Sequence, residues 1–136
     1  MSKTRYEIGE AQRRKVWGDE YVDKALGAID SFDRPFQDYV MENVFGRTWS
    51  SGVLSVRELS LINITMLAAA GRMDAFELHF RSALLYTKVP LAALREALMH
   101  IAIYCGAATG RDVFVIARKV LREEKVDVSV LDRDID

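Results

Sequence analysis

The sequence has few of the residues that interrupt helices or cross-link a chain. Among its 136 residues there are two prolines, Pro35 and Pro90, and one cysteine, Cys105. A lone cysteine cannot form an intramolecular disulfide, and the chain does not open with a cationic and apolar leader that ends in small residues. From these two absences we expect a cytoplasmic protein.

Neither sign of charge is in excess, and no apolar run is long. Lysine and arginine number 19 against 20 aspartate and glutamate, which leaves a net charge of −1. This balance gives no positive field to attract nucleic acid or an anionic membrane. The longest apolar stretch, residues 59–70, is about twelve residues long, whereas a membrane-spanning helix needs roughly 20. We therefore expect neither a nucleic-acid nor a membrane partner, and residues 59–70 are predicted to form a buried core helix.

Apolar residues recur at three- and four-residue spacing and alternating patterns are nearly absent, so the sequence predicts an all-α fold. The length suits a single domain over residues 1–136. The expected helices cover residues 9–17, 19–31, 35–45, 55–71, 74–87, 90–106 and 111–124, with a loop at 46–54 and a flexible tail or intersubunit strap at 125–136. Residues 59–70 and 91–102 are apolar over more than one helical face. One chain has too little interior to bury both, which predicts a homo-oligomer.

Most of the candidate chemistry lies in residues 76–106, which are predicted to form a helical hairpin. His79 and His100 are about equally far from the expected turn at residues 88–90. Since a helix rises about 1.5 Å per residue, the two imidazoles should lie at nearly the same level. Glu96 precedes His100 by about one helical turn and so shares its face. If that face and the His79 face both turn inward, the three side chains converge on one catalytic site.

Several segments spread along the chain have an order and spacing that are informative together: Tyr6-Glu7, Gly9, Arg13-Arg14, Gly18-Asp19, Phe36-Gln37, Trp49, residues 60–67, Glu77-Leu78-His79, Arg81, Glu96 and residues 102–106. In these segments the chain resembles the carboxymuconolactone decarboxylase family, specifically its gamma-carboxymuconolactone decarboxylase branch. The resemblance implies an alkylhydroperoxidase D-like helical bundle that assembles into rings, such as trimers or hexamers. It also implies decarboxylation of a small carboxylated lactone without a metal or an organic cofactor.

The resemblance assigns acid–base catalysis to His79, matches Glu96 to a family glutamate, and places Tyr104 and Cys105 in the pocket lining. Glu96 is expected to orient an imidazole or to hold the charge balance of the pocket, and His100 is the second catalytic histidine candidate beside His79. Arginine binds carboxylates through two parallel hydrogen bonds, and an aromatic ring can wall a pocket. The substrate-binding candidates added on these grounds are Arg13, Arg14, Arg81 and Trp49.

A carboxylate placed β or vinylogous to a carbonyl can leave as CO2 because the carbonyl accepts the electron pair as an enolate. The protein then supplies a proton and stabilises the oxyanion. A retro-aldol lyase or an isomerase would use the same groups, so these reactions remain alternatives. A further alternative is a non-catalytic helical oligomer that acts as a binding or scaffold subunit, since Ser51 stands where the family usually has an arginine.

Two other kinds of chemistry are not expected. Cys105 lacks a C-x-x-C partner, which argues against a dithiol peroxidase. Two histidines with one glutamate are a weak metal signal, so no metal site is predicted.

Overall fold

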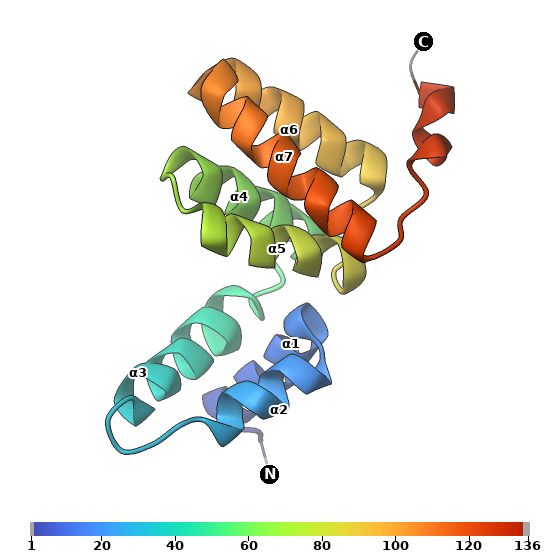
Figure 1. Cartoon of the computed structure of the whole chain (residues 1–136). Helices are drawn as coiled ribbons and strands as arrows, with labels where there is room; N and C mark the ends of the chain where they lie inside the picture. The colour runs from blue at the N-terminus through green and yellow to red at the C-terminus, as the bar shows by residue number, and fades with distance from the viewer. Residues whose placement is uncertain (1, 135–136) are drawn as a thin grey trace. The chain divides into compact units, whose positions relative to one another are not determined.

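The computed structural model describes residues 2–134, and every regular element in that range is helical (Figure 1). The elements are α1 Arg5–Trp17, α2 Asp19–Gly27, α3 Arg34–Tyr39, the π-helix η1 Val40–Thr48, α4 Val56–Ala69, α5 Met73–Leu85, α6 Leu91–Cys105, α7 Ala107–Glu123 and the 3-10 helix η2 Val128–Asp134. The all-α prediction is confirmed. By its contacts the chain divides into two compact units, Met1–Leu59 and Ser60–Asp136.

In the first unit, α1 begins earlier than the sequence analysis expected. The Thr4 side chain accepts a hydrogen bond from the Glu7 backbone N–H at 3.1 Å, and the Glu7 carboxylate accepts one from the Thr4 N–H at 2.8 Å. This reciprocal pair is a capping box, which satisfies two backbone donors at a helix start. Gly9, expected to start the helix, is instead a packing position, because a Cβ there would lie 2.0 Å from the Met41 carbonyl oxygen.

The loop expected from residue 46 is wrong for its first part, because the helical backbone continues as η1 to Thr48. Gly46 allows this continuation by packing closely, since a Cβ on it would lie 2.4 Å from the Arg5 carbonyl oxygen. Trp49 directly follows η1 and is 6% exposed. It belongs to a small core with Val16, Phe45 and Leu59. Trp49 is therefore part of a packed interior, which explains a large aromatic residue at this position.

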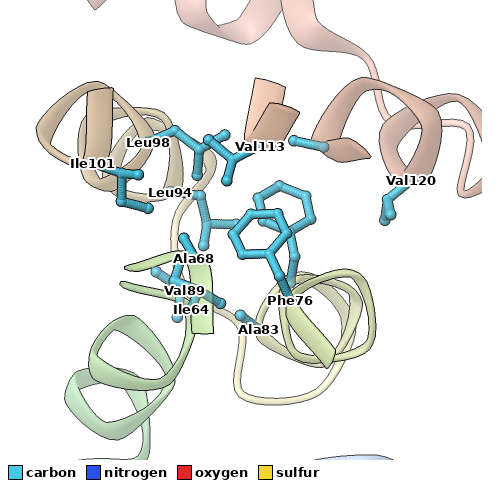
Figure 2. Packing of buried hydrophobic residues seen from close by; sticks show 12 residues of the cluster. Ile64, Ala68, Phe76, Ala83, Val89, Leu94, Leu98, Ile101, Val113 and Val120 are labelled. Carbon is cyan, nitrogen blue, oxygen red and sulfur yellow. The ribbon is translucent and has the colours of Figure 1, made fainter. Parts of the chain in front are cut away.

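The second unit has the larger core, to which α4, α5, α6 and α7 all contribute (Figure 2). Its buried residues are Ile64, Ala68, Phe76, Phe80, Ala83, Val89, Leu94, Leu98, Ile101, Val113, Ala117 and Val120. Fully burying a leucine or phenylalanine side chain stabilises a fold by about 1.5–3 kcal/mol, so this cluster is the main source of stability in the unit. None of the described helices is long and apolar enough to cross a membrane.

The two helices of the expected hairpin are confirmed as α5 and α6, each ending within a few residues of its predicted bounds. Lys88 in the turn between them has a positive φ of 55°, and Val89 is buried. The side-chain oxygens of Thr87 and Ser60 are 2.7 Å apart, which ties this turn to α4. Helix α7 packs closely against both α5 and α6. The helices α5 and α6 therefore do not form the simple two-helix hairpin that the sequence predicted.

Candidate active site

His79 lies on α5 and is half-buried, between the core residues Phe76 and Phe80. Burial lowers the pKa of its imidazole below the ordinary value, which is about 6.5, because a less polar environment disfavours the charged form. His79 is therefore neutral at neutral pH. Its conjugate imidazolium is a stronger acid than that of an exposed histidine. Both properties suit a group that takes up a proton and delivers it again.

Glu96 and His100 are exposed on α6, so their face does not turn into the core of the chain as the sequence analysis required. The inward positions of α6 are Leu94, Leu98 and Ile101. Glu96 and His100 each lie two residues from Leu98, a rotation of about 200° around the helix, and this places them on the opposite side. The expected inward convergence with His79 is therefore not observed within one chain.

Tyr104 and Cys105 extend this exposed face to the end of α6. The Tyr104 side chain is 78% exposed, and its ring centre lies 4.7 Å from that of His100. Cys105 is also exposed, and the helix ends after it at Gly106, which has a positive φ of 96°. Successive turns of α6 thus present a carboxylate, an imidazole and a phenol on one surface.

Two of the three candidate arginines already have carboxylate partners within the chain. Arg14 pairs with Asp23 at 2.8 Å, with Asp19 at 3.2 Å and with Glu10 at 3.5 Å. Arg81 on α5 pairs with Glu77 one turn earlier and with Glu123 and Glu124 at the end of α7. Their positive charges are therefore compensated, and in this structure both arginines join helices together.

Arg13 differs from both, because its guanidinium is buried without a carboxylate partner among the described residues. The residue is 7% exposed, and its guanidinium carbon lies 5.5 Å from the centre of the Phe45 ring. The Nε and Nη1 donors have no hydrogen-bond acceptor within the described part of the chain. Burial lowers the pKa of Arg13. Of the three arginines, Arg13 has unused capacity to bind a carboxylate.

The predicted site residues fall into two groups, one in each compact unit. The first unit holds Arg13, Arg14 and Trp49, whose ring stacks on Phe45 at 6.3 Å. The second unit holds His79, Arg81, Glu96, His100, Tyr104 and Cys105. Among residues 2–134, no three histidine, cysteine, aspartate or glutamate side chains are arranged to hold a metal ion. The acidic partners of Arg81 from α7 were missed by the sequence analysis, which had no signal for a contact so distant in the chain.

The model of the carboxymuconolactone decarboxylase family matches residues 34–119, well over half of the chain. The protein therefore belongs to this family. The matched range contains His79 and the α6 face described above.

Two curated relatives support the same assignment at low identity. A protein named 4-carboxymuconolactone decarboxylase from Acinetobacter baylyi is 27% identical over 130 residues, which cover 96% of each chain. A protein named nitrosuccinic acid decarboxylase npaB from Metarhizium robertsii is 28% identical over 118 residues, which cover 87% of this chain and 82% of that protein. The two names share a reaction type and differ in substrate.

Proposed function

We propose that this protein is a decarboxylase of a small carboxylated compound and that His79 transfers the proton. The observation that carries the proposal is that two relatives, each matched over most of its length, are named decarboxylases of different substrates. The two names agree on decarboxylation and differ in substrate, so they support the reaction type for this protein more strongly than either substrate. The substrate class is a small lactone or β-keto-acid-like compound bearing a carboxylate, as in the 4-carboxymuconolactone of the bacterial relative's name.

In the proposed reaction, the C–C bond to the carboxylate breaks and CO2 leaves. The bonding electron pair moves into the neighbouring carbonyl and forms an enolate. His79, which is neutral in the resting protein, takes up a proton from solvent, and the resulting imidazolium gives that proton to carbon and returns to the neutral form. The lowered pKa of His79 makes this imidazolium a better proton donor than an exposed one. A positioned general acid contributes about 10²–10⁴-fold in rate.

We assign the substrate carboxylate to Arg13, because its Nε and Nη1 donors lack acceptors in the described chain. An unpaired buried donor costs about 1–3 kcal/mol of stability, and a carboxylate ligand would offset that cost. Glu96 and His100 are assigned to the same catalytic site, where Glu96 orients an imidazole. Tyr104 and Cys105 are proposed to line the pocket beside them.

The protein is proposed to work as a homo-oligomer in which a second chain covers the exposed face of α6. Besides its polar candidates, this face carries Met99 and Ile103, of which Ile103 is 71% exposed. The predicted core helix α4 likewise leaves Met66 more than half exposed. Apolar surface of this kind is what oligomer interfaces bury. Covering the α6 face would also remove water from around Glu96 and His100.

The test is turnover of freshly prepared 4-carboxymuconolactone, followed by loss of its ultraviolet absorbance and by CO2 release. Nitrosuccinic acid and a panel of β-keto acids serve as further substrates. Wild type should release CO2 from at least one of them, and His79→Ala should lose at least about 10²-fold in kcat. Arg72→Gln is the matched control at the start of α5, since its side chain is exposed and pairs with the exposed Asp74; its activity should be unchanged.

Running the reaction in D2O separates the proposal from its alternatives. Decarboxylation with proton delivery places one deuterium on the carbon that lost CO2. An isomerase would alter a substrate without releasing CO2, and a retro-aldol lyase would release a carbonyl fragment in its place. A folded wild type that turns over none of these compounds, and whose melting temperature none of them raises, would favour the non-catalytic scaffold.

A further inference from the structure

An apolar cavity of about 100 Å³ lies within the second unit, apart from the candidate active site. Four elements form its wall: α5, α6, α7 and the 3-10 helix η2. The lining residues that matter here are Phe80, Leu94, Leu98, Phe114, Ala117 and Leu131. An apolar cavity of about 150 Å³ is known to bind a benzene ring. The cavity here is smaller, about 100 Å³, so it has room for at most one small ring and is too small for a long acyl chain.

Two arginines, Arg95 of α6 and Arg118 of α7, also line this cavity. Neither takes part in an ion pair or a hydrogen bond within the described residues. This sets them apart from Arg81, which pairs with three carboxylates. Two positive charges beside an apolar cavity favour an anionic group attached to an apolar body. Guanidinium groups bind carboxylates in particular, because the two planar groups match in geometry.

A basic groove on α7 adjoins the cavity, and its positive charge favours an anion there. Arg111, Arg118 and Arg122 line this groove, together with Phe114 and others. Phe114 and Arg118 line both the groove and the cavity, so the two spaces share a wall. Lys119 in the groove pairs with Glu77 at 3.0 Å, whereas the three arginines have no such partner among the described residues. The groove therefore carries uncompensated positive charge up to the cavity.

We propose that this cavity is a second ligand site, which binds a single-ring aromatic carboxylate. The ring occupies the space between Phe80, Phe114 and Leu131, and the carboxylate lies between Arg95 and Arg118. The 3-10 helix η2 contacts α6, and its Val128 and Leu131 line one side of the cavity. His79 does not line this cavity, so the ligand site can be tested independently of the proposed decarboxylase activity.

The probe is 4-fluorobenzoate, whose binding is followed by 19F NMR line broadening and quantified by calorimetry. Wild type should bind it. Arg118→Gln and Arg95→Gln should each weaken the affinity about tenfold or more, since each removes a charge-assisted hydrogen bond. Arg122→Gln is the matched control, because Arg122 lies on the same helix and lines the groove without lining the cavity; the affinity should change less than about twofold.

Two further arms locate the ligand. Ala117→Leu should fill the cavity and abolish binding, and a cooperative thermal melt establishes that this variant is folded; if it is not, the arginine variants decide. Octanoate should fail to compete with 4-fluorobenzoate, whereas benzoate should compete. The proposal is overturned if wild type does not bind 4-fluorobenzoate or if Arg118→Gln and Arg122→Gln weaken binding equally. Loss of binding in His79→Ala with full retention in Arg118→Gln would overturn it too, by moving the ligand to the candidate active site.

Discussion

The guanidinium carbon of Arg13 lies 5.5 Å from the centre of the Phe45 ring, in a site where two of its N–H donors lack acceptors among the described residues. A cation over an aromatic face gains about 0.5–2 kcal/mol, and each buried donor left unpaired costs about 1–3 kcal/mol. The arrangement is therefore unfavourable for folding alone. This favours a role for Arg13 in binding a carboxylate.

Replacing Arg13 with methionine should separate that role from stability. Methionine keeps an apolar stem of similar length and removes the buried charge, and apolar replacements of buried charges are often neutral or stabilising by about 1–4 kcal/mol. We expect Arg13→Met to melt at the same temperature as wild type or higher, and to raise KM at least tenfold for a turned-over substrate. A variant with a lower melting temperature and an unchanged KM would contradict the proposed role.

Arg14→Met is the matched control on the same helix. Arg14 pairs with Glu10, Asp19 and Asp23, so its loss should lower the melting temperature slightly. Exposed ion pairs contribute at most about 1 kcal/mol each. The KM of Arg14→Met should stay at the wild-type value.

The depressed pKa of His79 predicts how stability changes with pH. In the unfolded chain this imidazole titrates near its ordinary pKa of about 6.5, whereas in the folded chain burial shifts the pKa lower. As pH falls through 6.5, the unfolded state binds a proton first, and this lowers its free energy. The free energy of unfolding therefore decreases. This loss stops once pH is below the folded pKa.

Urea unfolding at pH 7.5 and at pH 5 measures this effect. The free energy of unfolding of wild type should fall more between these two pH values than that of His79→Gln, which cannot titrate. Equal losses in the two proteins would show that His79 is as easily protonated in the folded chain as in the unfolded one. His100→Gln is the control for the substitution itself, because it makes the same change at an exposed position on α6.

The helices were predictable from the sequence because their signals are local. Ser55 and Glu58 have the spacing of a capping box, and the structure shows both of its hydrogen bonds, at 2.9 and 3.0 Å. Thr4 and Glu7 have the same spacing and form the same pair of hydrogen bonds, so α1 begins earlier than the expected start at Gly9. The helical conformation of residues 46–48 could not be predicted, because glycine locally favours a turn. Glycine is needed at position 46 for a different reason, its close packing against Arg5.

The candidate site was less predictable than the fold, because the roles of its residues depend on contacts between distant segments. The sequence identifies Arg13, Arg14 and Arg81 as equal candidates for a carboxylate. Only the structure separates them, through carboxylates that α2 and α7 bring to Arg14 and Arg81. Likewise, helical spacing places Glu96 and His100 on one face, and burial shows that this face points outward.

The hydrogen bond between Ser60 and Thr87 should stabilise the turn that precedes α6. Their side-chain oxygens are buried and 2.7 Å apart, and a hydrogen bond of this kind contributes about 0.5–1.5 kcal/mol. A double-mutant cycle with Ser60→Ala and Thr87→Val should give a coupling free energy in that range. Strict additivity in urea unfolding would mean that the pair contributes nothing to stability.

Gly110 allows the close packing of α7 against α6. A Cβ on Gly110 would lie 2.5 Å from the Cβ of Ala102, which lies in the last turn of α6 and cannot move aside as a flexible side chain would. Gly110→Ala should therefore lower the free energy of unfolding by about 1–3 kcal/mol, the usual cost of overpacking, although alanine is the better helix former.

Gly27→Ala is the matched control for this prediction. Gly27 is the last residue of α2, and a Cβ added there would meet no atom within 4 Å. Because alanine restricts the unfolded chain more than glycine does, Gly27→Ala should be neutral or stabilising by up to about 1 kcal/mol. The added Cβ would meet the methyl group of Ala102, so a double variant with Gly110→Ala and Ala102→Gly should relieve the clash. This double variant should lose less stability than the sum of the losses of the two single variants. If Gly110→Ala instead unfolds like Gly27→Ala, the two helices do not pack as closely as the structure shows.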